Sequence, residues 1–350
     1  MPVSTGDRHL SVLSDIRSQP AAWTQALEVV GQHAAVLQDV SERPFSEVVY
    51  TGCGSTYYLT VAAAALHRRL VGSAARAVPA GELMLDPDRV QPGSLMIALS
   101  RSGQTTETVR AVEAHARAGG GTLVSVTCRQ ENELARHAQI DLRLPAAYES
   151  SVAQTRSFSS MWLATSLMIA TFAGRSDIST DMANLPALCA GLITRAEPAT
   201  AAIAADADLD RVYVLGSGVR YGLACEGSLL LKELALTDSE AFHFLEFRHG
   251  PIAMVTPRTL VIGLMDERGD ELELSVLRDA RAIGAHVLVL GDEPRHVDGA
   301  TLLDLGAACE PDAYSGLFLP PLQLLALARA TAAGLDTEHL RNLSAVIELA

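Results

Sequence analysis

Short apolar runs rich in β-branched residues alternate along this chain with Ala- and Leu-rich segments whose apolar positions recur with a helical period. The apolar segment SLMIAL (94–99), for example, is followed by the turn SRSGQT (100–105) and then by the helical pattern TETVRAVEAHARAG (106–119). Such alternation is typical of βαβ units, in which the strands form a parallel sheet and the connecting helices cover it. The pattern therefore predicts an α/β protein with open, doubly wound parallel sheets in three αβα layers.

Three segments of the first half have counterparts in the second half. VVYTGCGSTYY (48–58) matches VYVLGSGVRYG (212–222), LMIALSRSGQT (95–105) matches LVIGLMDERGD (260–270), and TLVSVT (122–127) matches HVLVLG (286–291). The offset is 164 or 165 residues in every pair, which indicates an internal duplication. We therefore expect two tandem flavodoxin-like domains, with ligands at the carboxyl ends of the strands.

Four parts follow from this duplication. We expect an N-terminal helical extension (1–30), a first domain (31–195), a second domain (196–335) and a C-terminal tail over the active site (336–350). The boundary between the domains falls in the Ala- and Asp-rich segment AEPATAAIAADADLD (196–210). That segment is either a linker or simply the first helix of the second domain, and its composition leaves both alternatives open.

The composition excludes several classes of protein. Of the 350 residues, 49% are hydrophobic and 19% are charged, as in ordinary globular proteins rather than disordered ones. The formal net charge of −14, with no basic run to offset it, argues against a nucleic-acid partner. An acidic protein that binds an anion must hold it with local donors, so we expect a dedicated loop.

The cysteines, the histidines and the apolar runs indicate the cellular compartment and whether a metal is bound. The five cysteines are odd in number and widely spaced, without a CxxC pair, which indicates neither a disulfide framework nor a zinc site. The ten histidines form no HExxH, and we expect neither a metal nor a cofactor. The segment MPVSTGDRHL does not resemble a signal peptide, and no apolar run reaches the length of a membrane span. We expect a cytoplasmic protein without membrane contact.

The turn SRSGQT carries three hydroxyls, a guanidinium and a glycine in six positions. Ser100, Ser102 and Thr105 around a glycine are typical of a phosphate cradle, because the glycine turn frees backbone N–H groups beside the positive end of the following helix. Arg101 adds a positive charge. The alternative is a plain helix cap, which explains one hydroxyl but not three. The equivalent segment MDERGD (265–270) carries acids that would repel an anion, so we expect the anion in the first half only.

A second strand-to-helix turn, GCGST (52–56), follows the apolar strand VVYT. It is not the dinucleotide-binding GxGxxG, because Tyr57 occupies the position of the third glycine. We expect Ser55 and Thr56 to face the same ligand as Ser100. The alternative is that the glycines merely allow the turn to close.

Candidate groups for proton transfer lie in the second half. The helix ACEGSLLLKELAL (224–236) carries Glu226 and Glu233, which are seven residues apart and therefore share a face with two leucines. A carboxylate beside apolar neighbours has its pKa raised toward that of a general base, whereas a solvated helix edge is the alternative. His249, in AFHFLEFRHGPIAMV (241–255), precedes Gly and Pro, which end a helix and leave the imidazole on a loop. A packed surface loop is the alternative there.

Together these motifs resemble the sugar isomerase (SIS) domain family, in particular the isomerase half of glucosamine-6-phosphate synthases and stand-alone phosphosugar isomerases and deaminases. The resemblance rests on TGCGST, LSRSGQTTET, ACEGSLLLKEL, RHGP and LRNLSAVIEL in that order, and it spans roughly residues 30 to 350. It implies a phosphosugar ligand, whose phosphate is bound by Ser55, Thr56, Ser100, Arg101, Ser102 and Thr105.

The resemblance also implies catalytic roles and an assembly. The enolisation base of the family falls on Glu233, and its ring-opening histidine falls on His249. The segment ESSVAQTRSF matches one that lines the sugar site, which, together with the tail, adds Val152, Gln154 and Ser344. Because the histidine comes from the neighbouring subunit in the synthases, a homodimer with shared active sites is implied.

Several positions depart from the synthases. Their tail lysine, which engages the ketose carbonyl, aligns with Ala345, and a helix lysine near the base aligns with Leu230. Gln and Glu of their phosphate loop appear here as Arg101 and Gln104. We therefore do not expect an imine through the tail. No glutamine-hydrolysing domain precedes the first strand, so we expect no glutaminase activity.

The function expected from these residues is that of an amino-sugar-phosphate deaminase/isomerase, which converts glucosamine 6-phosphate to fructose 6-phosphate and ammonia. A plain aldose–ketose phosphosugar isomerase and a fructosamine-6-phosphate deglycase are the alternatives. A non-catalytic phosphosugar sensor is an alternative of another class. It is disfavoured because the roughly 45 residues before the first strand are too few and too acidic for a DNA-binding helix-turn-helix.

Overall fold

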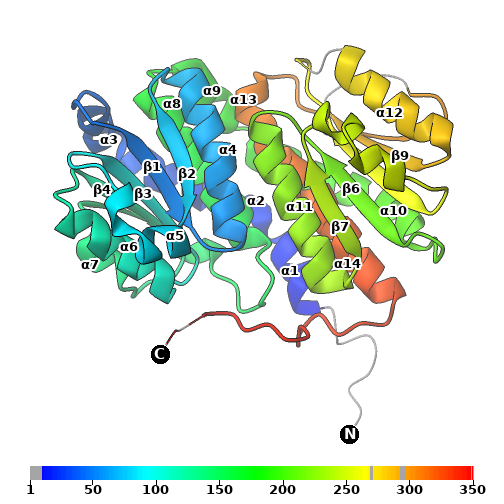
Figure 1. The fold of residues 1–350 in the computed structure, drawn as a ribbon, viewed down its shortest axis with the longest axis horizontal. Coiled ribbons are helices and arrows are strands. Elements are labelled where there is room, and N and C mark those ends of the chain that lie inside the picture. Colours follow the sequence, from blue (N-terminus) through cyan, green and yellow to red (C-terminus); the bar gives the residue numbers. More distant parts are fainter. Residues whose placement is uncertain (1–9, 269–270, 292–296, 348, 350) are drawn as a thin grey trace, which may run out of the picture. The chain divides into compact units, whose positions relative to one another are not determined.

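The computed structural model describes residues 10–268, 271–291, 297–347 and 349 (Figure 1). These residues form two compact units, each built on one parallel sheet. The first unit holds residues 18–150, 154–186 and the chain end from Ser344, and the second unit holds the described residues within 10–17, 151–153 and 187–343. The predicted α/β class, with two tandem doubly wound domains, is confirmed.

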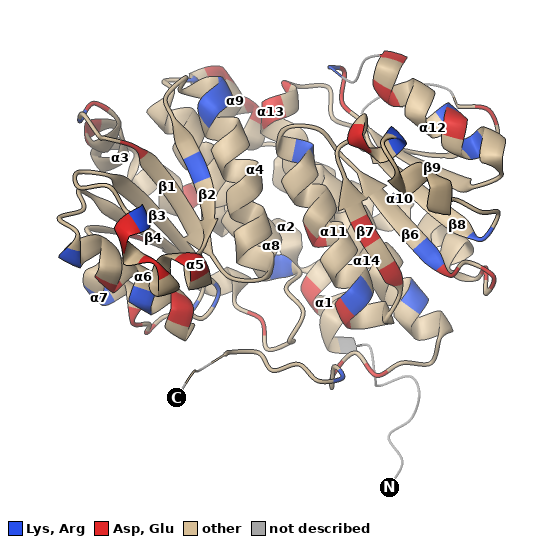
Figure 2. Cartoon of the chain, in the orientation of Figure 1, with Lys and Arg blue, Asp and Glu red and all other residues tan. Residues whose placement is uncertain are grey.

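The first unit has a sheet with the strand order β2-β1-β3-β4-β5. Its strands are β1 (Val48–Gly52), β2 (Ala75–Pro79), β3 (Leu95–Ser100), β4 (Leu123–Thr127) and β5 (Ile140–Arg143). Every residue of β1, β3 and β4 is buried, as expected for parallel strands that are covered on both faces and have nearly continuous apolar sequences. Figure 2 shows the same pattern, because the charged residues lie mainly on helices and loops while these strands are tan.

Helices cover both faces of this sheet. They are α2 (Gln19–Gln32), α3 (Ala34–Ser41), α4 (Ser55–Leu70), α5 (Ala80–Leu85), α6 (Thr106–Arg117), α7 (Leu134–His137), α8 (Arg156–Phe172) and α9 (Ser176–Met182). Neighbouring residues of a strand point to opposite faces. Tyr50 therefore reaches His67 of α4 on one face, whereas Val49 packs with Ala111 and Val112 of α6 on the other.

The second unit repeats this topology. Its sheet order is β10-β9-β8-β6-β7, which is the order of the first sheet read from the other edge, with β6 in the place of β1. The strands are β6 (Arg211–Leu215), β7 (Asp238–Phe242), β8 (Thr259–Leu264), β9 (His286–Gly291) and β10 (Thr301–Asp304). The helices are α1 (Leu10–Arg17), α10 (Leu185–Ala204), α11 (Val219–Ala235), α12 (Glu271–Ile283), α13 (Pro311–Tyr314) and α14 (Leu319–Ala332).

The expected domain boundary at residue 195 falls inside a helix. α10 runs without a break to Ala204, and its residues from Ala187 onward already belong to the second compact unit. The Ala- and Asp-rich segment is therefore helical over most of its length and leads directly into β6. The expected N-terminal extension is divided, because α1 belongs to the second unit, where Arg17 pairs with Glu197 of α10 at 2.6 Å, and α2 belongs to the first.

Candidate functional site

The order of the first sheet reverses between β1 and β3, which is where ligands bind in doubly wound sheets. These two strands are hydrogen-bonded neighbours, so the turns that follow Gly52 and Ser100 leave the same edge of the sheet side by side. Cys53 Sγ lies 3.6 Å from Thr108 Oγ1 in the first turns of α6, which joins the first turn to the helix that follows the second. The hydroxyl-rich segments predicted to share a ligand are thus neighbours in the first unit.

The β3–α6 loop is shaped by its own hydroxyls. Ser100 Oγ accepts a hydrogen bond from the Gly103 N–H at 3.0 Å, and Ser102 Oγ accepts one from the Gln104 N–H at 3.1 Å. These two N–H groups are therefore used within the loop, and the expected phosphate cradle stays a prediction. Thr105, the N-cap of α6, makes no side-chain cap bond, and its Oγ1 lies 3.4 Å from Ser100 Oγ. Because an accepting hydroxyl keeps its own O–H, Ser100 and Ser102 remain able to donate to an anion.

Gly103 is required by its backbone and by its neighbour. Its φ is +63°, and a Cβ at this position would lie 2.5 Å from the Cβ of Asn132. Asn132 is buried; its Nδ2 donates to Thr127 Oγ1 at 3.1 Å and its Oδ1 accepts the Ala135 N–H at 2.9 Å. Asn132, itself fixed by these hydrogen bonds, therefore packs against Gly103 and holds the loop rigidly. Asn132 is not identifiable from the sequence, since no motif marks the segment that contains it.

The β1–α4 turn uses its two hydroxyls differently. Thr56 Oγ1 accepts the Cys53 N–H at 3.0 Å and donates to the Cys53 carbonyl at 2.8 Å, so its proton is spent on closing the turn. A Cβ on Gly52 would approach this Oγ1 to 2.7 Å, which explains the glycine. Ser55, the first residue of α4, is buried, and within the described part of the chain its hydroxyl makes no hydrogen bond. Ser55 is therefore the stronger candidate ligand of the pair.

The segment 149–158 begins with a buried carboxylate that caps α8. Glu149 Oε1 accepts the N–H groups of Thr155 (2.8 Å) and Ser157 (3.0 Å) and the Ser157 hydroxyl, and Oε2 accepts the Arg156 N–H (3.0 Å) and the Thr155 hydroxyl (2.7 Å). Five donors saturate the carboxylate, so Glu149 organises the helix start and is not placed to take a proton from a ligand.

The predicted sugar-site residues of this segment are half-buried and divide between the units. Val152 belongs with the second unit, whereas Gln154 belongs with the first, where its Oε1 lies 3.4 Å from Ser157 Oγ. Ser344 of the tail is exposed and donates to the Val346 carbonyl at 3.2 Å.

Helix α11 of the second unit carries the candidate base. Glu226 is fully buried in the middle of the helix, so it belongs to the core and not to a solvated edge. Glu233, in the last turn, is half-buried. The exposed Lys232 beside it donates to Ser228 Oγ at 3.1 Å, and that hydroxyl lies 3.1 Å from Ser239 Oγ of β7. Lys232 is the single lysine among the 350 residues.

His249 lies on a loop that buried aromatics anchor. Phe244 and Phe247 belong to the hydrophobic core of the second unit, and Arg248 pairs with Asp279 of α12 at 2.5 Å. His249 follows the short 3-10 helix Glu246–Arg248 and is exposed, as the sequence predicted for a histidine before Gly and Pro. The two phenylalanines of this loop are thus buried, whereas its imidazole is exposed to solvent.

Comparison with known families decides the relationship. The family model described as "SIS domain" matches residues 45–171 and 207–296, so one match falls on each sheet. The chain belongs to the SIS domain family. The two matched ranges contain the paired segments of the predicted duplication, and the resemblance inferred from the motifs is confirmed.

Named relatives cover this SIS chain almost completely. It is 30% identical over 357 residues to the glutamine–fructose-6-phosphate aminotransferase (isomerizing) of Symbiobacterium thermophilum, a match that includes 95% of this chain and 58% of the relative. The chain thus spans little more than half of that curated relative. Two solved structures share the fold: glucosamine-6-phosphate deaminase from Thermotoga maritima (24% identity, TM-score 0.77, 97% and 100% of the two chains) and tagatose-6-phosphate ketose/aldose isomerase from Escherichia coli (22%, 0.84, 97% and 96%).

In the second SIS repeat an arginine stands at the start of the helix that follows the first strand. Arg220 takes the sequence position of Thr56; it lies 3.0 Å from Glu273 and 3.5 Å from Asp266, and it donates to the Leu264 carbonyl at 2.7 Å. The acids of MDERGD were expected to repel an anion. Asp266 is paired with Arg220, whereas Asp270 lies outside the described residues, so the expected repulsion stays a prediction.

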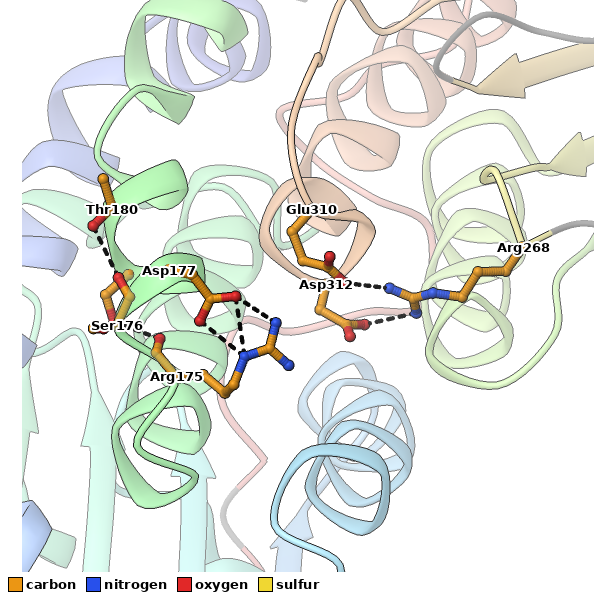
Figure 3. Close-up of polar contacts among 8 residues, drawn as sticks. Arg175, Ser176, Asp177, Thr180, Arg268, Glu310 and Asp312 are labelled. Carbon is orange, nitrogen blue, oxygen red and sulfur yellow. Dashed lines mark hydrogen bonds and ion pairs between the residues drawn. The ribbon is translucent and has the colours of Figure 1, made fainter.

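Ion pairs also hold the next residues of that loop. Arg268 donates to Asp312 at 2.9 Å and to Glu310 at 2.8 Å at the start of α13 (Figure 3). Figure 3 also shows the pair formed by Arg175 and Asp177 at the start of α9 in the first unit. The asymmetry between the SIS repeats therefore lies in their loops, since their strand orders are the same.

The described residues contain neither a membrane-spanning helix nor a cluster of metal ligands. None of their helices combines the length and the apolar character that crossing a membrane requires. Within the same residues, no three side chains of His, Cys, Asp or Glu are grouped as a metal ion would need.

Proposed function

We propose that this SIS protein converts glucosamine 6-phosphate to fructose 6-phosphate and ammonia. The observation that carries the proposal is the group of hydroxyl donors at the carboxyl edge of the first sheet, contributed by Ser55, Ser100, Ser102 and Thr105 at the starts of α4 and α6. The relative and the neighbours reported above are each named for a sugar 6-phosphate, which supports a ligand of this class.

Phosphate binding in this loop supplies orientation rather than chemistry. The positive ends of α4 and α6 and the hydroxyl protons favour a dianion, although the protein as a whole is acidic. The phosphate lies far from the reacting carbons of a hexose, so its binding energy holds C1 and C2 in place for proton transfer.

The proposed chemistry uses His249 and Glu233. His249 moves a proton between O5 and O1 and opens the ring. Glu233 takes the proton from C2, which gives an enolamine, and returns it to C1, which gives the ketose imine. Water adds to that imine, ammonia leaves, and fructose 6-phosphate remains, so one water is consumed for each ammonia released. Because residue 345 is alanine, the tail provides no amine, and the nitrogen that leaves is the substrate's own.

As part of the same proposal, His249 acts in the site of a partner subunit in a homodimer. Its exposure supports this role. Mixed dimers of Glu233→Gln and His249→Asn would contain one site with both native groups, so mixing the two inactive variants should restore about a quarter of the wild-type activity. No restoration would show that both groups act within one chain.

A substrate panel tests the reaction. The pure protein is incubated with hexosamine 6-phosphates and with hexose 6-phosphates, and ammonia and ketose are measured separately. We expect both products from glucosamine 6-phosphate, and a loss of about 10²–10⁴ in turnover for Glu233→Gln with ligand binding retained. Deuterium at C2 should exchange with solvent or move to C1 in the wild type only. Glu240→Gln on the exposed side of β7 is the matched control.

The other outcomes select the other candidates. Ketose without ammonia would identify an aldose–ketose isomerase. Binding without any turnover would identify a sensor. Full activity of Glu233→Gln would show that this carboxylate is only a charge on the helix face, and Glu246 on the His249 loop would be tested next.

A further inference from the structure

A cavity of about 180 Å³ lies at the amino edge of the first sheet. Val48 and Leu95, the paired first residues of β1 and β3, line it, and its other walls come from the last turns of α3, α4 and α8 and from the loops 42–47 and 71–74. All its lining residues belong to the first unit. The length of β1 separates the cavity from the turn at Gly52 by roughly 13 Å, so it is distinct from the candidate functional site.

The buried polar group of this cavity is His67. It is only 2% exposed; its Nδ1 lies 2.8 Å from the Tyr50 hydroxyl oxygen, and its Nε2 lies 2.9 Å from Ser73 Oγ. Burial lowers the pKa of His67 to about 4, so near neutral pH the imidazole is uncharged and carries one N–H.

The hydroxyl of Tyr50 decides which nitrogen carries this proton. Tyr50 is fully buried, and among the described residues His67 is the only partner of its hydroxyl. A buried O–H without an acceptor is costly, so Tyr50 donates to Nδ1. Nε2 therefore carries the ring proton and donates it to Ser73 Oγ.

This arrangement leaves the proton of Ser73 for a ligand. Ser73 Oγ accepts from His67, and its own O–H makes no hydrogen bond within the part of the chain that the structure describes. Ser73 is exposed and lines the cavity. A hydroxyl whose oxygen is already held by a fixed donor presents its O–H in a defined place, so Ser73 is a donor prepared for an acceptor in the cavity.

The charged groups of the cavity leave a positive charge without a counterion. Glu47 accepts hydrogen bonds from Arg76 Nε at 2.7 Å and from Arg76 Nη2 at 2.9 Å, and this contact lowers the pKa of the Glu47 carboxyl. Arg43, in contrast, forms no ion pair with any described residue, and its Nη1 makes only a long hydrogen bond of 3.4 Å to Thr122 Oγ1. The acid of the cavity is thus neutralised and the base is not, which favours an anionic ligand.

Two phenylalanines favour a planar apolar body for that anion. Phe45 and Phe172 both line the cavity, and the ring of Phe172 meets His67 edge to face, with centroids 6.3 Å apart and planes at 74°. Aromatic rings prefer such edge contacts or offset stacking with one another. An apolar cavity of about 150 Å³ holds one benzene molecule, so the volume here suits a single ring. Its charged group would lie on the open side, where Arg43 and Ser73 are exposed.

We propose that this cavity is a second binding site of the protein and that its ligand is a small aromatic carboxylate. The ring packs against Phe45 and Phe172, and the carboxylate accepts hydrogen bonds from the Arg43 guanidinium and the Ser73 hydroxyl. His67 orients Ser73 and does not itself need to touch the ligand. The inference does not rest on the proposed reaction, because the cavity and the phosphate turns lie at opposite edges of the sheet.

Benzoate is the probe, and calorimetric titration of the full chain measures its dissociation constant. We expect a value of about 1 mM or tighter, which is within reach of a ligand of this size. Benzamide has the same shape without the charge and should bind at least about tenfold more weakly, and acetate, which lacks the ring, should show no saturable binding. Equal affinities for benzoate and benzamide, or saturable binding of acetate, would overturn the proposal.

Two substitutions assign the binding to the cavity. Arg43→Gln should weaken benzoate binding at least about tenfold and leave the affinity for benzamide unchanged. Arg110→Gln, which removes an exposed arginine of α6 outside the cavity lining, is the matched control and should change neither affinity. Ala74→Phe, at an exposed lining position, should fill the cavity and abolish the binding of both compounds, with the melting temperature as the check on folding. Unchanged benzoate affinity in Arg43→Gln or in a folded Ala74→Phe protein would overturn the proposal.

Nuclear magnetic resonance locates the ligand directly. The Nε2–H resonance of His67 should shift as benzoate is added, and an excess of inorganic phosphate should not reverse that shift. Displacement of benzoate by phosphate, with shifts at the Gly103 and Gln104 amides and none at His67, would show that benzoate binds at the phosphate loop and would overturn the second site. Absence of any saturable benzoate binding would overturn it as well. Neither result bears on the proposed deaminase reaction, which the sugar-phosphate panel tests separately.

Discussion

The substitution Glu149→Gln tests whether the Glu149 carboxylate stabilises the fold or takes part in catalysis. Glutamine has nearly the same shape but offers one acceptor oxygen where glutamate offers two. In the best orientation the glutamine oxygen takes the place of Oε1 and still accepts the hydrogen bonds from the Thr155 N–H and from the N–H and hydroxyl of Ser157. Its NH₂ group then faces the Arg156 N–H and the Thr155 hydroxyl, which were bound to Oε2.

The magnitude follows from these five hydrogen bonds. The Thr155 hydroxyl can rotate and accept from the new amide, but the Arg156 N–H cannot, so one charge-assisted bond is lost at a cost of about 1.5–3 kcal/mol. The bonds to the remaining oxygen become neutral and weaken by about 0.5–1 kcal/mol each. The favourable charge at the start of α8 also disappears. We expect a loss of about 3–6 kcal/mol in the free energy of unfolding of the first unit, a large fraction of the typical total of about 5–15 kcal/mol.

Chemical and thermal unfolding followed by circular dichroism measure this loss, which corresponds to a melting temperature lowered by roughly 10 °C. The matched control is Glu133→Gln in the same unit, since Glu133 is a surface residue that pairs with Arg136 and its replacement should cost less than about 0.5 kcal/mol. Turnover for each folded molecule, measured well below the transition, should be preserved in both variants. A Glu149→Gln protein that is as stable as the control but has lost activity a hundredfold or more would refute the capping role.

Three further predictions test the loops, the lysine and the pH response. Ser100→Ala should weaken sugar-phosphate binding by about 1.5–3 kcal/mol. Asp266→Asn should leave that affinity unchanged but lower the stability of the protein, because it breaks the buried pair with Arg220. Calorimetric titration and denaturation distinguish the two effects, and equal losses of affinity would contradict the asymmetry between the SIS repeats. Borohydride reduction with fructose 6-phosphate, followed by mass spectrometry, should leave the C-terminal peptide unlabelled. Because Lys232 is the single lysine, a label on Lys232 would require a mechanism with an imine on α11. Burial lowers the pKa of His67 to about 4, so the unfolded chain binds more protons than the folded chain below pH ~6.5. The free energy of unfolding should therefore fall by up to about 3 kcal/mol as the pH drops from ~6.5 to ~4. His67→Gln should lack this part of the pH dependence, and a profile identical to that of the wild type would contradict the prediction.

The architecture was predictable because it depends on local patterns. Continuous apolar strands such as 95–99 require cover on both faces, and helical periods between them provide it, so the α/β class and the duplication followed from the sequence. The glycines at 52 and 103 marked their turns for a steric reason, since a Cβ at either position would collide with a neighbour. The motifs by themselves indicate the SIS family, which the family model confirms.

The sequence alone therefore determined the class of fold, the repeat, the family and the segments that carry the candidate chemistry, because periodicity and glycine positions are properties of consecutive residues. Only the tertiary structure decided which hydroxyls retain a donor, that Glu149 caps α8, that Asn132 supports Gly103 and that Arg220 pairs with Asp266 and Glu273. Arg101 and Ala345 are 244 residues apart, and nothing in their local sequence records that they meet. Such contacts depend on how complete elements pack, since the partner of a polar group is chosen by proximity in space and by the cost of leaving that group unsatisfied.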